Sequence, residues 1–278
     1  MIGVIDVGGG LRGIYGSGVF DRFIDDGVEF DYCIGVSAGS ANAITYLANQ
    51  KGRTYRYYHD YSERKEYMSF GNFFKCGQYI DLDYVYSTMT NSDGEDPLDF
   101  ATAIKNKADL TIVVTDALTG EPVYFSKHDM KQDDYTILKA SSALPGVCKG
   151  YEINNKVYYD GGVSDPVPVQ KALDDGCDKL VLVLTKPLGS RDTLARDAKM
   201  AKLLRRKYPI LANKLQEKSI NYKKGVDLAL ELQKQGKCLI VAPDDCCGVS
   251  TLTTDKNKLR ALYEKGYNDG GRIKEFVK

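Results

Sequence analysis

Several residue types and patterns that would place this chain of 278 residues in a common protein class are scarce or missing. It has only two histidines and no Cys-x-x-Cys pair among its seven cysteines, so a zinc site made of Cys and His has few candidate ligands. Lys plus Arg and Asp plus Glu both number 38, so no overall positive charge favours nucleic acid. We therefore expect no metal, no cofactor and no nucleic-acid partner.

Long hydrophobic runs are also missing. The longest uninterrupted apolar run is about six residues, far short of the roughly 20 that span a bilayer. The apolar share of 43% and the charged share of 27% are typical of a globular protein, and a chain of this length buries a core without disulfides. The odd number of cysteines favours reduced thiols in the cytoplasm. We expect residues 1–5 to start a core strand rather than a signal peptide.

Short apolar runs alternate with helical patterns along the chain, which is typical of an α/β fold with a mainly parallel sheet. The predicted strands cover residues 2–7, 31–36, 110–115, 123–125, 156–159, 179–184 and 238–242. The predicted helices cover residues 14–26, 38–50, 135–142, 190–235 with a break at Tyr208-Pro209, and 254–276. Because the strand at 238–242 returns to the sheet, we expect a single domain over 1–278, with a basic helical excursion at about 190–235.

The pentapeptide Gly35-Val36-Ser37-Ala38-Gly39 has the pattern Gly-x-Ser-x-Gly and lies between a predicted strand and a predicted helix. That context is the one in which a nucleophilic serine occupies a sharp turn, and glycines two residues before and after it leave room for the turn. The helix that follows would place its positive end at the hydroxyl of Ser37. The alternative is a helix start at which Ser37 is a simple cap.

A glycine-rich loop, Gly8-Gly9-Gly10-Leu11-Arg12-Gly13, also joins a strand to a helix. Its backbone N–H groups are suited to an oxyanion hole, and its Gly-x-Gly-x-x-Gly spacing also matches a dinucleotide-binding loop. A dinucleotide site needs an acidic residue at the end of the second strand, but Ser37 follows that end and Asp31 lies at its start. A tight turn without a ligand is the third interpretation.

The serine needs a base, and histidine is the usual one. No motif surrounds either His59 or His128, and we expect both to be surface residues. A carboxylate within hydrogen-bond reach can serve instead. The candidate is Asp160, which ends a predicted strand and precedes Gly161-Gly162.

Together, the glycine-rich loop, the serine turn and Asp160-Gly161-Gly162 resemble the patatin-like phospholipase family in its compact bacterial form. The segment Ala140-Ser141-Ser142-Ala143-Leu144-Pro145 is similar to that family's Ala-Ser-x-Ala-x-Pro segment. The resemblance covers roughly residues 1–185, whereas residues 186–278 carry no motif of the family.

The resemblance implies a three-layer α/β/α fold that cleaves acyl esters of lipids with a Ser-Asp dyad and no metal. Ser37 would attack the ester carbonyl, and Asp160 would accept its proton and later activate the water that hydrolyses the acyl-enzyme. We assign the oxyanion hole to the backbone N–H groups of Gly9, Gly10 and Leu11. We expect Arg12 to hold the glycine loop rather than to contact phosphate. The residues with supporting roles are Gly8, Arg12, Gly13, Gly35, Gly39, Gly161 and Gly162.

Other functions remain open at this point. A serine acyltransferase or thioesterase on a related fold would use the same nucleophile, and a non-catalytic lipid-binding protein would not use it at all. The stretch 186–224 carries twelve Lys or Arg and three Asp or Glu. It could contact an anionic membrane peripherally, although such helices are more often solvated faces. We expect the substrate pocket to be lined by the irregular region 51–109 and by the helices of 190–235.

Overall fold

The computed structural model describes residues 1–190 and 194–278, without the side chains of 194–196; the part of the predicted excursion at 191–193 lies outside the described residues. Eight strands form one sheet in the order β5-β6-β3-β2-β1-β7-β8, and β4 pairs with β3 off this path. The strands are β1 (Ile2–Asp6), β2 (Tyr32–Val36), β3 (Asp109–Asp116), β4 (Pro122–Ser126), β5 (Tyr151–Ile153), β6 (Lys156–Asp160), β7 (Lys179–Val183) and β8 (Cys238–Val241).

The predicted fold class is confirmed. Strands β1, β2, β3, β7 and β8 are parallel to one another, and β4, β5 and β6 run antiparallel to their neighbours. The short strand β5 was not predicted, because three residues give too little alternation to detect. Strand β8 pairs in parallel with β7, as expected for a strand that returns to the sheet.

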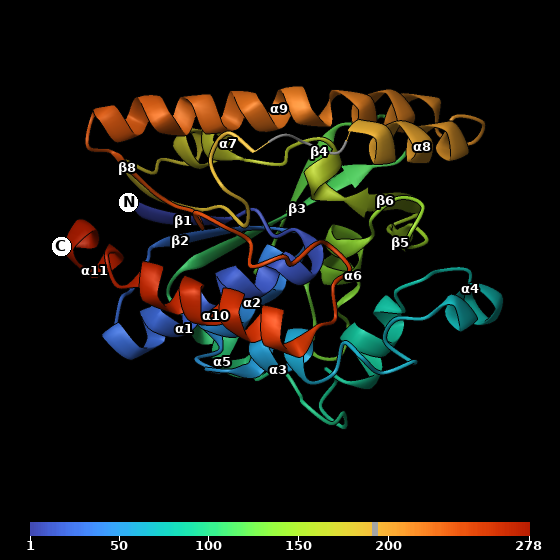
Figure 1. The fold of residues 1–278 in the computed structure, drawn as a ribbon, viewed down its shortest axis with the longest axis horizontal. Coiled ribbons are helices and arrows are strands. Elements are labelled where there is room, and N and C mark those ends of the chain that lie inside the picture. The colour runs from blue at the N-terminus through green and yellow to red at the C-terminus, as the bar shows by residue number, and fades with distance from the viewer. Residues whose placement is uncertain (191–193) are drawn as a thin grey trace.

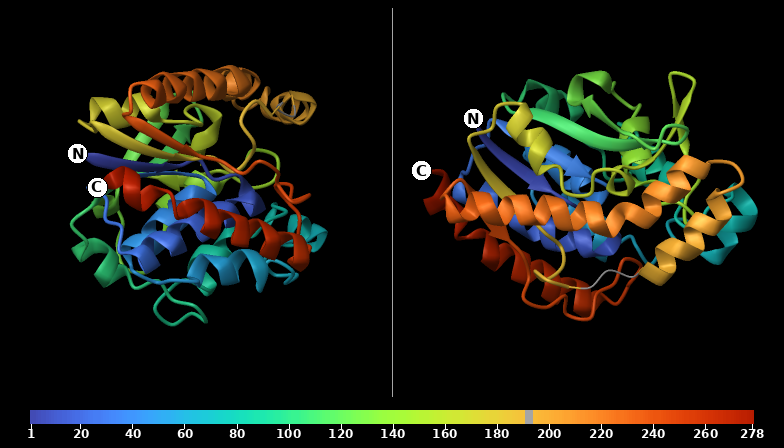
Figure 2. Two further views of the ribbon diagram at one scale, coloured as in Figure 1. Left: turned by 60° about the vertical axis from the view of Figure 1, so that its left-hand side comes forward. Right: turned by 90° about the horizontal axis from the view of Figure 1, so that it is seen from above.

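Helices cover both faces of the sheet (Figures 1 and 2). They are α1 (Ile14–Asp26), α2 (Ala38–Leu47), α3 (Arg53–His59), α4 (Phe70–Cys76), α5 (Phe100–Lys105), α6 (Thr136–Ser142), α7 (Val169–Asp174), α8 (Leu194–Leu204), α9 (Pro209–Lys234), α10 (Lys256–Gly270) and α11 (Ile273–Val277). In Figure 1, α7 and α9 lie above the sheet and α1, α2, α5 and α10 lie below it. No helix of the described residues is long and apolar enough to cross a membrane.

The core is divided by the sheet, because successive side chains of a strand point to opposite faces. Along β1, Val4 belongs to the larger cluster with α1 and α2, and Ile5 to the smaller cluster with α7 and α9. Both are fully buried. Parallel strands that are covered on both faces have near-continuous apolar sequences, so no polar face is visible in these segments.

Two predicted helices differ from the observed ones. The helix predicted over 38–50 ends at Leu47, and the one predicted over 254–276 is two helices, α10 and α11, separated after Gly270. The predicted break at Tyr208-Pro209 is confirmed, since Pro209 is the first residue of α9. A π-helical turn, η2 (Tyr84–Thr88), lies in the region predicted to be irregular.

The first and the last long helices cross each other at two glycines. A Cβ on Gly18 of α1 would lie 2.2 Å from the carbonyl oxygen of Tyr263, and one on Gly266 of α10 would lie 2.1 Å from that of Tyr15. Both distances are far inside van der Waals contact, so the two backbones touch where a side chain has no room.

We expect Gly266→Ala to destabilise the protein by about 1–3 kcal/mol, because its methyl group must push α10 away from α1. In a helix without such a contact, the same change adds up to about 1 kcal/mol of stability. Chemical denaturation measures the difference, with Glu264→Ala on the exposed side of α10 as the control. A midpoint for Gly266→Ala equal to or above that of the unmodified protein would contradict the close contact.

Candidate active site

The register of β3 brings Ser37 and Asp160 together. Val113 of β3 pairs with Val36, the last residue of β2, and Val114 pairs with Asp160, the last residue of β6. Strand β4 pairs with residues 111–115 of β3 along one edge, so β2, which pairs with 109–113, and β6, which pairs with 114–116, share the other edge and run toward each other. The C-terminal ends of β2 and β6 therefore meet end to end, which places Ser37 next to Asp160.

Ser37 occupies the sharp turn between β2 and α2. Its φ is 58° and its ψ is −131°, in the left-handed half of backbone space that residues with a Cβ rarely adopt. A Cβ on Gly35 would lie 2.3 Å from the Cα of Ser40, and one on Gly39 would lie 2.2 Å from the carbonyl oxygen of Asp6. The two glycines of the pentapeptide are thus required by close packing on both sides of the turn.

Asp160 accepts hydrogen bonds with both carboxylate oxygens. The Ser37 hydroxyl donates to Oδ2 at 2.7 Å, and the Gly162 N–H donates to Oδ1 at 2.8 Å. The side chain is 4% exposed, and burial raises the pKa of its carboxyl, while the charge of Lys218 and these two hydrogen bonds act in the opposite direction. A carboxylate with a raised pKa is a stronger proton acceptor and stands in contact with the serine oxygen.

Ser141 of α6 holds the turn at Ser37 in place. Its hydroxyl accepts the N–H of Ser37 at 3.0 Å and donates to the carbonyl of Val113 at 2.7 Å. It also shares a hydrogen bond of 2.9 Å with the hydroxyl of Ser40 on α2. The Ala-Ser-x-Ala-x-Pro segment thus supplies a buried polar group that ties the turn to β3.

The glycine-rich loop lies beside the serine turn, and a Cβ on Gly8 would lie 2.3 Å from the carbonyl oxygen of Val36. Among the described residues, the N–H groups of Gly9 and Gly10 donate to no acceptor, and both glycines line the cavity that contains Ser37. The third expected donor requires a correction. The N–H of Leu11 donates to the carbonyl of Thr251 at 3.0 Å, because the loop around Thr251 packs against the glycine loop.

Arg12 lies against the same loop. Its guanidinium donates to the Thr251 hydroxyl at 3.3 Å, and a Cβ on Gly9 would lie 3.2 Å from its Nη2. This position fits the expected role of holding the glycine loop. Arg12 also lines the cavity.

A buried carboxylate under the loop was not predicted. Asp6, the last residue of β1, is fully buried; it accepts the N–H of Gly8 at 2.8 Å and the side-chain amide of Asn42 at 2.8 Å. Burial raises the pKa of Asp6 to about 6. Asn42 of α2 also donates to the carbonyl of Gly13 at 2.9 Å, so this pair joins both ends of the glycine loop to the helix that follows Ser37.

The histidine predictions are half right. His128 is exposed, as expected. His59 is buried instead of being at the surface, because its ring stacks on Tyr55 with centroids 4.7 Å apart and its Nδ1 lies 2.7 Å from a carboxylate oxygen of Asp60. Neither imidazole lines the cavities at Ser37. The described residues contain no group of three or more His, Cys, Asp or Glu that could hold a metal.

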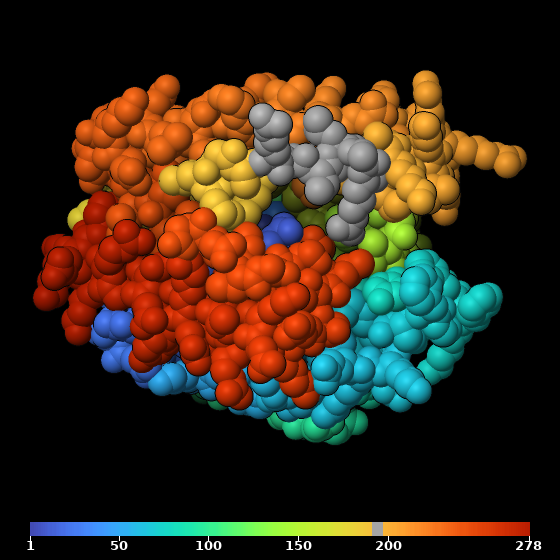
Figure 3. All heavy atoms as spheres, in the orientation of Figure 1, coloured from blue at the N-terminus to red at the C-terminus, as the bar shows by residue number. Residues whose placement is uncertain are grey.

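Two cavities meet at Ser37. The first, of about 160 Å³, contains the glycine loop, Ser37 and Asp160, and it also takes in Lys186 and Lys218. The second, of about 70 Å³, is mainly apolar; its lining includes Leu11, Ala38, Ala41, Tyr57, Tyr58, Tyr67, Leu82, Val85 and Tyr86. In Figure 3, atoms of the N-terminal segment (blue) are visible at the bottom of a hollow bordered by the C-terminal segment (orange-red).

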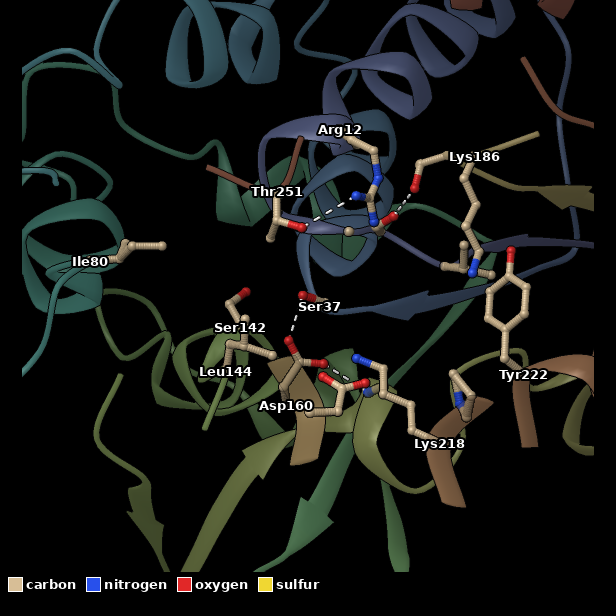
Figure 4. A pocket seen from close by; sticks show the side chains of 18 residues that line it. Arg12, Ser37, Ile80, Ser142, Leu144, Asp160, Lys186, Lys218, Tyr222 and Thr251 are labelled. Carbon is tan, nitrogen blue, oxygen red and sulfur yellow. Dashed lines mark hydrogen bonds between the residues drawn. The ribbon is translucent and has the colours of Figure 1, made fainter. Parts of the chain in front are cut away.

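The expected origin of the pocket lining is confirmed. Ile80 comes from the region 51–109, and Lys218 and Tyr222 come from α9. Figure 4 shows these side chains around Ser37 and Asp160. The contribution of Thr251 was not predicted, and neither was the selection of Lys218 from the many cations of 186–224. The sequence held one signal for the role of Asp6: it is an acidic residue at the end of an apolar strand, directly before the glycine loop.

Comparison with known proteins identifies families that the chain matches. A family model described as "Patatin-like phospholipase" matches residues 7–173, and a model described as a domain of unknown function (DUF6363) matches residues 208–278. The "Uncharacterized protein YjjU" of Escherichia coli is 31% identical over 191 residues, which cover 67% of this chain and 52% of that protein.

Two further comparisons are more distant. The "Uncharacterized NTE family protein Rv1063c" of Mycobacterium tuberculosis is 33% identical over 88 residues, which cover 32% of this chain and 23% of that protein. The crystal structure of VipD from Legionella pneumophila aligns with a TM-score of 0.49 at 13% identity, over 98% of this chain and 66% of that one. The chain thus spans about half of YjjU and less than a quarter of the mycobacterial relative.

The buried carboxyl of Asp6 leads to a prediction about stability and pH. Its pKa is raised on folding, so the folded protein binds the proton more tightly than the unfolded chain does, and the stability that this proton provides is lost as pH rises. We expect the free energy of unfolding, taken relative to Asp6→Asn, to fall by up to about 3 kcal/mol between pH of about 4 and about 6. Urea denaturation at several pH values measures this difference, and a difference that is constant with pH would contradict the raised pKa.

Proposed function

The chain belongs to the patatin-like phospholipase family, and on this premise we propose that it is a lipid acyl hydrolase that uses Ser37 as nucleophile and Asp160 as base. The observation that carries the proposal is the hydrogen bond of 2.7 Å from the Ser37 hydroxyl to Asp160 Oδ2. It lies in a cavity whose described lining contains no imidazole, so the carboxylate is the group in position to take the proton.

The proposed reaction has two steps. Ser37 Oγ attacks the ester carbonyl as its proton moves to Asp160. The oxyanion of the tetrahedral intermediate then accepts hydrogen bonds from the N–H groups of Gly9 and Gly10. When the intermediate collapses, the carbon–oxygen bond to the alcohol breaks and the alcohol takes the proton from Asp160. Water then loses a proton to Asp160, attacks the acyl group on Ser37, and releases the fatty acid while the proton returns to Ser37.

The rigidity of the glycine loop supports these reaction steps. The Gly8 and Leu11 N–H groups on either side of the oxyanion donors bond to Asp6 and Thr251, so the N–H groups of Gly9 and Gly10 need no reorganisation when charge develops on the oxyanion. The apolar cavity beside Ser37 is suited to the acyl chain of the substrate. We also propose that residues 1–278 work as one unit, since β8 lies in the common sheet and Thr251 contacts the glycine loop.

A peripheral contact with the cytoplasmic face of an anionic membrane is part of the proposal. Helices α4 and α8 lie at the same end of the molecule (Figures 1 and 2). On α4, Phe70 and Phe74 are 75% and 95% exposed. Exposed cations follow along α8 and after it: Lys202, Arg205, Arg206 and Lys207. Exposed apolar rings and cations at one end of a molecule are suited to the headgroup layer of a membrane. Of the other cations in 186–224, Arg191 lies outside the described residues.

We expect Ser37→Ala and Asp160→Asn each to lower ester hydrolysis by about 10³-fold or more, because each removes one of the two groups that carry the reaction. The measurement is kcat/KM on p-nitrophenyl esters and on defined phospholipids. His128→Ala, at an exposed position, is the control and keeps most of the activity. A fluorophosphonate probe should label the unmodified protein at Ser37. A Ser37→Ala variant that retains full activity, or a folded protein that is never labelled, would contradict the proposal.

For the membrane contact, we expect Arg205→Gln/Arg206→Gln/Lys207→Gln to sediment with anionic vesicles several-fold less than the unmodified protein, at about 1 kcal/mol per cation. The vesicles are phosphatidylcholine alone and phosphatidylcholine mixed with phosphatidylserine. Lys234→Gln/Lys237→Gln, at the opposite end of α9, is the control and sediments like the unmodified protein. Equal sedimentation of the unmodified protein with both vesicles would rule out the contact.

A further inference from the structure

The chemical character of the cavity changes from one side of Ser37 to the other (Figure 4). Ile80, Ser142 and Leu144 lie on one side, next to the second, tyrosine-lined cavity. Lys186 and Lys218 lie on the other side. An ester whose carbonyl is at Ser37 would therefore have an apolar region available for its acyl part and a cationic region available for its alcohol part.

The two lysines approach the cavity from different elements. Lys218 comes from α9 and is close enough to Asp160 for its charge to lower the pKa of that carboxyl. Lys186 follows β7, and its Nζ lies 3.8 Å from the ring centroid of Tyr222, also on α9. Both lysines are partly buried. A partly buried ammonium group has lost some of its hydration, which makes an anion in the cavity a better partner than it is in open solvent.

The described lining of the cavity contains one more cation than carboxylates. The cations are Arg12, Lys186 and Lys218, and the carboxylates are Asp160 and Asp197. Arg12 is already engaged with Thr251 on the glycine-loop side. Among the described residues, no ion pair or hydrogen bond involves Lys218, which lines the cavity, so its ammonium group is available to a ligand.

One wall of the cavity belongs to the segment that matches a domain of unknown function. Within 208–278, Lys218, Tyr222 and Thr251 line the cavity. Helix α9 is held close to the core, since a Cβ on Gly225 would lie 2.4 Å from the carbonyl oxygen of Val167. The position of Lys218 relative to Asp160 is therefore set by backbone packing rather than by a flexible surface loop.

We propose that segment 208–278, through Lys218 acting with Lys186, forms an anion-binding subsite for the phosphate of an acyl ester whose alcohol part carries that phosphate. The inference rests on the proposed function, because it places the leaving alcohol on the cationic side of Ser37. When the ester bond breaks, the alcohol oxygen takes the proton from Asp160 while the lysines hold its phosphate. Lys218 and Lys186 are thus specificity-determining residues, and the nucleophile and base remain Ser37 and Asp160.

The test compares two esters that differ only in the phosphate: 1-acylglycerol 3-phosphate and 1-acylglycerol with the same acyl chain. We expect the unmodified protein to prefer the phosphate ester in kcat/KM by about tenfold or more, the size expected for a charge-assisted contact. Lys218→Met and Lys186→Met should each reduce this ratio about fivefold or more. Lys224→Met, at an exposed position on α9, is the matched control and leaves the ratio unchanged. Unfolding midpoints establish that each variant is folded.

Lys218 could instead act only by tuning Asp160, and a pH series separates the two roles. Removing the lysine raises the pKa of Asp160, which lowers activity on both esters equally, and only at the acidic end. Loss of the subsite lowers the ratio between the esters at every pH. An equal loss on both esters confined to low pH would overturn the subsite, as would a ratio near one in the unmodified protein.

Inhibition experiments test the same subsite. sn-Glycerol 3-phosphate should inhibit competitively and more strongly than glycerol, and this difference should shrink in Lys218→Met. Inhibition by inorganic phosphate that is non-competitive with the ester would identify a free-anion site and overturn the assignment to the substrate. Ser37→Ala distinguishes failure of the proposed function from failure of the subsite. Full activity in that variant refutes the proposed function itself. Hydrolysis that depends on Ser37 but shows no preference for the phosphate ester refutes only the subsite.

Discussion

The hydrogen bond between Ser37 and Asp160 depends on a register, and most of the surrounding structure maintains that register. Adjacent residues of β3, Val113 and Val114, pair with the ends of β2 and β6, so a shift of β6 by one residue would turn Asp160 to the opposite face of the sheet. The carbonyl of Val113 accepts the Ser141 hydroxyl, and a Cβ on Gly161 would lie 2.2 Å from the same oxygen. Packing around one peptide group thus fixes the positions of Ser37, Asp160 and the segment behind them.

The features predicted correctly from the sequence are those that local residue patterns determine, such as helix ends and glycine-containing turns. Helix α1 runs over Ile14–Asp26 as expected, because Gly27 adopts the left-handed conformation that ends a helix. The contact between Ser37 and Asp160 was expected because both residues lie in motifs whose glycines have steric purposes. His59 was misplaced, since nothing in the local sequence indicates that Tyr55 and Asp60 bury it.

Features that join distant parts of the chain could not be predicted in this way. Lys218 is one of twelve cations between residues 186 and 224, and only the direction in which α9 crosses the sheet selects it. The same limit applies to Leu11, which was expected to face a substrate oxygen. Its N–H meets the carbonyl of Thr251, a residue from a segment with no recognisable motif. Sequence spacing carries no information on such contacts, because they depend on tertiary packing alone.

The contact of Arg12 with Thr251 joins residues that are 239 positions apart, and the contact of Tyr15 with Asp269, between α1 and α10, joins residues that are 254 positions apart. Contacts of this kind form late in folding, because the loop they close must first be ordered. During synthesis on the ribosome, the turn at Ser37 emerges before Thr251 and α10, so the glycine loop lacks these supports until both segments have left the exit tunnel. A nascent chain of this protein therefore carries the proposed nucleophile before the glycine loop beside it is held in place.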